Sequence, residues 1–361
     1  MVKWFLITAG VLLFVIAGGI FYYCLNNLPG REILVDNVDS AVQPLSLERE
    51  NRELKREKLN KKTILFVGDI MLDRAVERLM KRNSVFYPFQ KINQFTKGID
   101  IVFGNLEGPI MKNPPDFSDD SLKFAFSSDM IEGLKFANFN LLSLANNHSL
   151  DMGKGGLEET KEFLEKENIN FVGDPLKCTE DFLYQEDDII FFAFNKTYPS
   201  SCSDEEILET IKSVRLKNPK KFLIVSIHWG KEYQLKSYLS QRKLAHKIID
   251  IGADLIIGHH PHTVQEIEIY KNKLIFYSLG NFIFDQYFSK DTQQGLAIGL
   301  EIYPNKFIYR LFPIQSKLSQ PFLMEQKESE EFLEKLAERS DENLSEQIKN
   351  GIIKTKRFDK D

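Results

Sequence analysis

The stretch GHHPH (residues 258–262) follows the apolar run ADLII (residues 253–257) and determines how the rest of the chain is interpreted. The chain has six histidines, and three of them lie in this stretch. His148 and His228 also follow apolar runs, whereas His246 lies in a helical pattern. Because imidazole is the commonest neutral metal ligand, histidines collected at the ends of predicted strands indicate a metal site.

The composition indicates a globular protein with one large core. The chain has 361 residues, 43% of them hydrophobic, which is enough to fill such a core. A net charge of -5 with mixed signs gives no electrostatic reason to expect nucleic acid as a partner. Three cysteines are too few for a disulfide framework. Cys178 and Cys202 could pair in an oxidising space, but two thiols are the expected state.

The N-terminal part predicts a membrane anchor. Residues 4–25 carry no charge and are long enough to span a bilayer as a helix. Trp4 and Tyr22–Tyr23 suit the two membrane interfaces. A cleaved signal peptide is the alternative, but the bulky residues at the end of the run disfavour cleavage. We expect a single-pass anchor over residues 1–25 at the cell membrane. Lys3 favours a cytoplasmic N-terminus and an extracytoplasmic body.

The remaining chain divides into three parts by composition. Residues 26–62 are dominated by charge and are expected to form a stalk. In residues 63–321, short runs of β-branched and aromatic residues alternate with helical patterns, which is typical of an α/β domain. Residues 322–361 are again highly charged and predict a helical tail, either solvated or docked on a partner.

Six apolar runs of the body end in polar side chains that can bind metals. In open α/β sheets, sites form outside the carboxyl ends of the strands, so these side chains are expected to converge. Carboxylate, amide and imidazole groups together suit Mn²⁺, Fe²⁺ or Zn²⁺. Two such ions about 3.5–4 Å apart would clamp a phosphoryl group. The candidates, in chain order, are Asp69; Asn105 and Glu107; Asn146, Asn147, His148 and Asp151; His228 and Glu232; His259, His260 and His262; and Asn281 and Asp285.

Within residues 258–262, an extended backbone would separate the three histidines into two directions. Side chains alternate with period two along an extended segment, so His260 and His262 would point the same way. We therefore expect these two to bind metal and His259 to face away, in a supporting role.

Six motifs that contain these candidates follow one another along residues 64–303. They are GDIM (68–71), GNLE (104–107), ANNH (145–148), HWG (228–230), GHHPH (258–262) and YSLGNFIFD (277–285). Together they resemble the CapA family, the capsule-synthesis proteins of bacteria that produce poly-γ-glutamate. That family is in turn similar to the calcineurin-like metallophosphoesterases.

The resemblance implies an α/β fold of four layers, with two mixed sheets flanked by helices. It also implies a role in capsule or poly-γ-glutamate synthesis or export, and two divalent metal ions. The metal ligands that it implies are Asp69, Glu107 in the bridging place, Asn147, His228, His260 and His262. His148 would act as an acid on the leaving group, with Asp151 as its catalytic companion. The expected second shell comprises Asn105, Asn146, Glu232, His259, Asn281 and Asp285.

Two functions follow from this pattern. The first is a membrane-anchored, metal-dependent hydrolase that resembles a phosphoesterase and acts on an anionic polymer or a phosphoester. The second is a non-catalytic subunit of a membrane polymer synthase or export complex. The dense set of metal-capable residues favours the hydrolase. Met71 favours the second function, because metallophosphoesterases usually carry a histidine there and a thioether is a poor ligand for hard cations.

Overall fold

The computed structural model describes residues 61–118, 121–198 and 202–357. The predicted anchor and nearly all of the predicted stalk lie outside these residues. No helix within the described part of the chain is both long and apolar enough to cross a bilayer.

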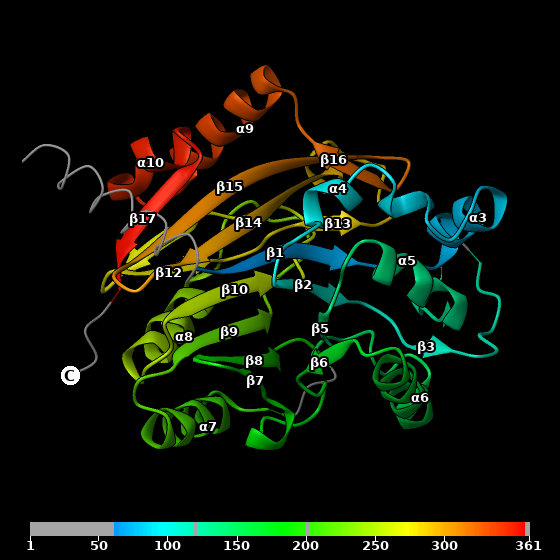
Figure 1. Ribbon diagram of the computed structural model, residues 1–361, viewed down its shortest axis with the longest axis horizontal. Helices are drawn as coiled ribbons and strands as arrows, with labels where there is room; N and C mark the ends of the chain where they lie inside the picture. The colour runs from blue at the N-terminus through cyan, green and yellow to red at the C-terminus, as the bar shows by residue number, and fades with distance from the viewer. Residues whose placement is uncertain (1–60, 119–120, 199–201, 358–361) are drawn as a thin grey trace, which may run out of the picture. The chain divides into compact units, whose positions relative to one another are not determined.

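Two mixed β-sheets form the centre of the described chain (Figure 1). The strands of the nine-stranded sheet are β1 (Lys62–Ile70), β2 (Ile101–Leu106), β5 (Leu141–Ser143), β6 (Asn170–Val172), β13 (Asn281–Ile283), β14 (Gln294–Ile302), β15 (Lys306–Lys317), β16 (Gln320–Leu323) and β17 (Ile352–Lys356). Its order is β16-β15-β14-β1-β2-β5-β6, with β13 beside β1 and β17 beside β15.

The six-stranded sheet has the order β11-β12-β10-β9-β8-β7. Its strands are β7 (Tyr184–Glu186), β8 (Ile189–Asn195), β9 (Phe222–His228), β10 (Leu255–His259), β11 (Ile267–Tyr270) and β12 (Lys273–Phe276). A separate pair joins β3 (Ile110–Met111) to β4 (Phe126–Ser127). Central strands such as β9 are buried along their whole length, as expected for parallel strands covered on both faces.

Helices cover the outer faces of the two sheets. The inner faces share one core, in which the rings of Phe103 and Phe191 stack across the sheets at 5.7 Å. On the outer side of the six-stranded sheet lie α7 and α8 (Figure 1). The described helices are α3 (Arg74–Arg82), α4 (Asn93–Thr96), α5 (Ile131–Phe136), α6 (Gly153–Lys166), α7 (Asp204–Lys217), α8 (Leu239–Asp250), α9 (Gln326–Arg339) and α10 (Ser345–Lys349). The short 3₁₀ turns are η1 (Tyr87–Phe89), η2 (Ser128–Met130), η3 (Glu180–Phe182), η4 (Asp291–Gln293) and η5 (Glu342–Leu344). The predicted α/β class is confirmed.

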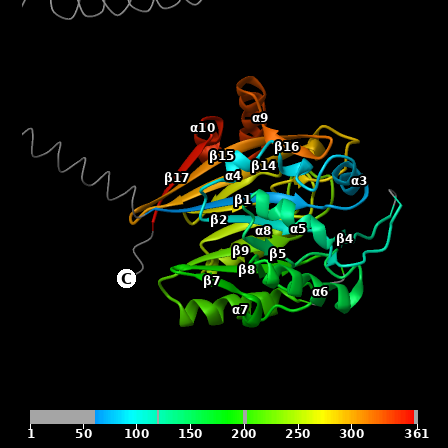
Figure 2. The same ribbon diagram turned by 45° about the vertical axis from the view of Figure 1, so that its right-hand side comes forward.

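The segment predicted as a solvated or partner-bound tail is instead part of the domain. In α9, Phe332, Leu333 and Leu336 are buried in the core that the two sheets share. The strand β17 pairs antiparallel with β15, and both views show it beside that strand (Figure 1; Figure 2). The high charge of the segment hid this arrangement, because an apolar stripe at helical spacing lies among its acidic and basic residues.

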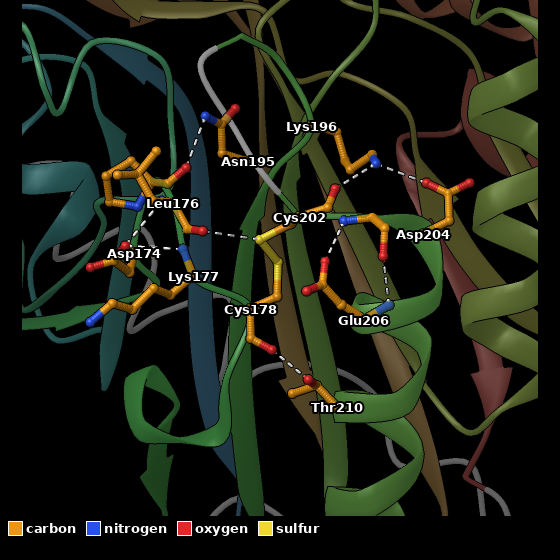
Figure 3. Close-up of a disulfide and its surroundings, with 12 residues drawn as sticks. Asp174, Leu176, Lys177, Cys178, Asn195, Lys196, Cys202, Asp204, Glu206 and Thr210 are labelled. Carbon is orange, nitrogen blue, oxygen red and sulfur yellow. Dashed lines mark hydrogen bonds and ion pairs between the residues drawn. A yellow bond between two sulfur atoms is a disulfide. The ribbon is translucent and has the colours of Figure 1, made fainter.

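Cys178 and Cys202 form a disulfide, so the expectation of two thiols is wrong (Figure 3). The bond joins the segment before η3 to the N-terminus of α7, whose Thr210 donates a hydrogen bond to the Cys178 carbonyl. Both cysteines are buried against the apolar side chains under α7. The sequence separation of 24 residues gave no local signal for the pairing.

Removing this disulfide should destabilise the domain. The bond closes a loop across a separation of 24 residues, so the double variant Cys178→Ser/Cys202→Ser should lose about 3 kcal/mol of unfolding free energy. Urea denaturation would measure the loss. A reducing agent should lower the stability of the wild type to that of the variant and leave the variant unchanged. Equal stability of the wild type and the variant in the absence of a reducing agent would contradict the prediction.

Candidate metal centre

The site lies where carboxyl ends of strands from both sheets meet. Asp69 lies near the end of β1, His228 ends β9 and His259 ends β10. Two glycines on these strands leave room for the backbone of residues 277–280. A Cβ on Gly68 would lie 1.9 Å from the Gly280 carbonyl oxygen, and one on Gly258 would lie 2.0 Å from the carbonyl oxygen of Tyr277. Both obstacles are backbone atoms, so neither position has room for a side chain.

The Asp69 carboxylate is the buried centre of this region. Its Oδ1 accepts from Asn105 Nδ2 at 2.9 Å and from His259 Nδ1 at 3.1 Å. Its Oδ2 lies 3.3 Å from both the backbone nitrogen of His260 and the Nδ1 of His262. Burial alone would raise the pKa of Asp69, but the hydrogen bonds from the two imidazoles outweigh it and hold that pKa well below its usual value.

His228 is held as a neutral imidazole between two asparagines. Its Nδ1 lies 3.2 Å from Asn105 Nδ2, and its Nε2 lies 2.7 Å from Asn147 Oδ1. The Asn147 oxygen can only accept, so Nε2 carries the proton and the lone pair of Nδ1 faces Asp69 and Glu107. Burial, and then the neighbouring His260, hold the pKa of His228 well below its usual value. Metals bind the neutral form of imidazole.

Glu107 brings a second buried carboxylate beside Asp69. Burial, and then the charge of Asp69, raise the pKa of Glu107 well above its usual value. Its Oε1 accepts from Asn105 Nδ2 at 3.1 Å, while its Oε2 is buried and has no hydrogen-bond partner among the described residues. Asp69, Glu107 and His228 place one potential ligand atom each within 4.8 Å of one another.

Glu232, His260 and His262 form a second group of the same kind, again with ligand atoms within 4.8 Å. The His262 Nδ1 contacts both Asp69 Oδ2 and, at 3.0 Å, Asn281 Oδ1, so it carries the proton and leaves the Nε2 lone pair available. Burial, and then the neighbouring His262, lower the pKa of His260 to about 4. The sequence assigned Glu232 to a supporting shell, yet its carboxylate stands with the potential ligands.

The three histidines of residues 258–262 do not follow the expected alternation. The φ angles of His260 and His262 are 95° and 57°, so the backbone turns after β10 and is not extended. The prediction that His259 faces away is therefore wrong, since its Nδ1 contacts the Asp69 carboxylate. The Nε2 of His259 is buried and has no hydrogen-bond partner among the described residues.

His148 and Asp151 stand beside these groups in a cleft of about 920 Å³. The His148 Nδ1 lies 2.8 Å from Asp151 Oδ2, and the ring packs on Phe124 at 4.2 Å. The same carboxylate oxygen accepts from the Phe124 backbone nitrogen at 2.7 Å, which fixes its position. The cleft also borders Asn147, Glu232 and His262, so it connects the His148–Asp151 pair with the two ligand groups.

The other predicted residues hold the surrounding loops. Asn146 is buried, and its Oδ1 accepts from the backbone nitrogens of His148 and Ser149 at 3.0 Å. Asn281 orients His262, as described above. Asp285 lies farther along the cleft and pairs with Arg74, whose Nε donates to Asp285 Oδ2 at 3.2 Å.

Met71 contributes no ligand, as its thioether predicts, whereas Arg74 lines the cleft without having been predicted. Met71 is fully buried in the apolar core between the nine-stranded sheet and the helices that cover it. Its Sδ accepts from the Asp73 backbone nitrogen at 3.1 Å. It therefore supports the turn before α3 and belongs to neither ligand group. Arg74 lines the cleft through its pair with Asp285. No motif indicated it, because the two partners are 211 residues apart.

The potential ligand atoms of the two groups suit divalent cations. Buried Glu107 Oε2 and His260 Nδ1 lack hydrogen-bond partners within the described residues, and both lie in the two ligand groups. Such atoms are costly to bury unless a cation or another partner binds them. Three carboxylates with three imidazoles also match the ligand preferences of borderline divalent metals.

Comparison with known proteins gives the family. Residues 63–286 match the family described as bacterial capsule synthesis protein PGA_cap. The chain belongs to this family. The resemblance stated from the sequence motifs is thereby confirmed, since the match contains all the site residues described above.

Two relatives and one solved structure show the degree of similarity. The capsule biosynthesis protein CapA of Bacillus anthracis is 32% identical over 279 residues, which cover 71% of this chain and 66% of the relative. The PGA biosynthesis protein CapA of Bacillus subtilis (strain 168) is 33% identical over 251 residues, which cover 64% and 66%. The chain thus spans about two thirds of the length of these relatives. The purple acid phosphatase PPD1 of yellow lupin is 13% identical, with a TM-score of 0.36, over 73% of this chain and 53% of the phosphatase.

The buried carboxyl of Glu107 should make the metal-free protein less stable as pH rises. A raised folded-state pKa means that the folded state binds more protons than the unfolded state, so stability falls from about pH 4.5 upward until the carboxyl ionises. Glu107→Gln keeps an acceptor for Asn105 and removes this titration. In chelator-treated samples, the variant should therefore gain stability over the wild type as pH rises. Parallel pH profiles of urea-unfolding free energy would contradict the prediction.

Proposed function

We propose that this protein is a membrane-anchored, metal-dependent hydrolase of the phosphoesterase type that acts in capsule or poly-γ-glutamate synthesis or export. The observation that carries the proposal is the convergence of two ligand groups, Asp69–Glu107–His228 and Glu232–His260–His262, beside the His148–Asp151 pair. The family assignment and the names of the two Bacillus relatives support the role in the capsule.

Each ligand group would hold one divalent ion of Mn, Fe or Zn. Such ions, when bound, polarise a phosphoryl oxygen and lower the pKa of a bound water. The chain itself orients the ligands. Asp69 fixes the proton of His262 on Nδ1, which directs the Nε2 lone pair away from the carboxylate. Asn147 borders both His228 and the cleft, so its amide can contact substrate or the ion beside it.

His148 is placed to supply a proton to the leaving group. Asp151 contacts its Nδ1, which leaves Nε2 as the atom that can donate a proton toward the cleft. Packing of the ring against Phe124 fixes its orientation. The arrangement resembles a base held by a carboxylate, in which the carboxylate sets the tautomer and does not itself transfer the proton.

The disulfide supports an extracytoplasmic location for the domain. Disulfides persist in oxidising compartments and are rare in the cytosol, where thiols are kept reduced. The bond between Cys178 and Cys202 therefore agrees with a body outside the cell membrane. The uncharged residues 4–25 would supply the anchor, with the N-terminus in the cytoplasm.

Metal content and hydrolysis of the purified full-length protein test the proposal. The wild type should bind two divalent ions per chain, measured by elemental mass spectrometry, and hydrolyse p-nitrophenyl phosphate or bis-p-nitrophenyl phosphate. His262→Ala should lose bound metal, and its activity should fall by more than about 100-fold, because loss of even an outer-shell partner costs up to that much. His246→Ala is the matched control, because His246 of α8 pairs with Glu268 of β11 and belongs to neither ligand group. Full activity without bound metal would refute the proposal, and bound metal without turnover would favour a non-catalytic subunit.

A second variant separates proton transfer from metal binding. His148→Ala should retain both ions, because His148 belongs to neither ligand group. Its kcat should fall by about 10²–10⁴-fold, as expected for loss of a general acid. The loss should be smaller for p-nitrophenyl esters, whose leaving group needs little protonation, than for alkyl esters. An equal loss for both classes of ester would show that His148 acts otherwise.

A further inference from the structure

The cleft beside the ligand groups has an unusually exposed apolar rim. The rim residues are Leu122, Tyr198, Tyr233 and Phe288, whose exposed fractions are 84%, 92%, 44% and 67%. All four line the same cleft as His148 and His262. Large apolar side chains that gather in this way on a soluble surface mark binding sites more often than chance exposure does.

Aromatic rings in contact with one another connect the ligand groups to this rim. The ring of Phe284 lies 4.9 Å from that of His262 and 5.9 Å from that of Phe124. On the other side, Tyr233 lies 6.2 Å from the His262 ring and meets Phe288 edge-on at 5.2 Å. A ligand held at the metal centre would therefore extend over aromatic side chains as it leaves the cleft.

The charges of the lining do not suit a ligand with many negative groups. The lining carries three carboxylates, Asp151, Glu232 and Asp285, against two cations, Arg74 and Lys123. Arg74 is already paired with Asp285. Glu232 belongs to the metal centre, so beyond that centre the carboxylates of Asp151 and Asp285 only balance the two cations. The lining therefore offers no surplus of positive charge to a chain that carries a carboxylate on every unit.

We propose that the substrate is an amphiphilic phosphoester, with one phosphoryl group at the ligand groups and an apolar chain along the rim. The proposal rests on the proposed phosphoesterase function and names the substrate class for that site. Hydrolysis adds water across the P–O bond: the phosphoryl group gains the hydroxyl oxygen, and the leaving alcohol takes a proton. The apolar chain gains affinity in proportion to the surface that the rim removes from water.

Binding of non-hydrolysable alkylphosphonates tests this proposal without any catalytic readout. Titration calorimetry would use the full-length protein in lipid nanodiscs with Mn²⁺, and empty nanodiscs would be subtracted as background. Ethyl-, butyl- and hexylphosphonate share one head group and differ only in chain length. Affinity should rise at least about tenfold from ethyl to hexyl, since a fully buried methylene contributes roughly fourfold.

Two variants test whether the gain in affinity with chain length depends on the rim residues. Leu122→Ser/Phe288→Ser should lose most of the gain with chain length. Leu216→Ser is the matched control, because Leu216 is 73% exposed on α7 and does not line the cleft. It should behave as the wild type does.

The outcomes distinguish the substrate class from the proposed function. Equal binding of all three phosphonates, or a gain that persists in the rim variant, would overturn the amphiphile alone. Tighter binding of a sugar phosphonate than of hexylphosphonate would overturn it as well, and would assign the rim to sugar rings. No binding by any phosphonate would overturn both proposals.

Discussion

The buried carboxylate of Asp69 is the interaction on which the site depends. It comes from the nine-stranded sheet, yet two of its partners, His259 and His262, come from the strand and loop of the six-stranded sheet. A buried carboxylate is costly unless its oxygens are hydrogen-bonded, so the two sheets are held in one relative position at this point. Glycines at positions 68 and 258 leave room for residues 277–280, which connect β12 of one sheet to β13 of the other, because a Cβ at either position would lie about 2 Å from the backbone of that segment.

The sequence predicted which strand ends meet, because a simple rule of α/β sheets applies here. Parallel strands present their carboxyl ends at one edge, and the buried runs of β1, β9 and β10 are long enough to be recognised. The rule places residues at an edge but does not orient side chains. Glu232 was therefore placed outside the potential ligands, and His259, although expected in the supporting shell, was expected to face away from Asp69. Only the positive φ angles at His260 and His262, which periodicity cannot reveal, bring all three histidines of the stretch to one carboxylate.

Long-range contacts explain the other errors of sequence reasoning. Cys178 and Cys202 pair because β8 and the segments around it bring two loops together, and spacing alone does not encode that proximity. The C-terminal segment is similar, since its buried residues lie within a strongly charged sequence. Alternate residues of β17 are buried against the sheet, a period-two pattern that is short and easily missed.

Several polar side-chain atoms of the site are buried and have no hydrogen-bond partner within the described chain. Glu107 Oε2, His259 Nε2 and His260 Nδ1 are buried without partners in the described chain, although most buried polar atoms of this domain are hydrogen-bonded. Their burial works against folding, and the large shared core and the disulfide offset it. Proteins retain such local costs mainly where function requires them. The unpaired atoms of Glu107 and His260 therefore argue for cation binding more directly than the count of histidines does, because both belong to residues that stand together as potential ligands.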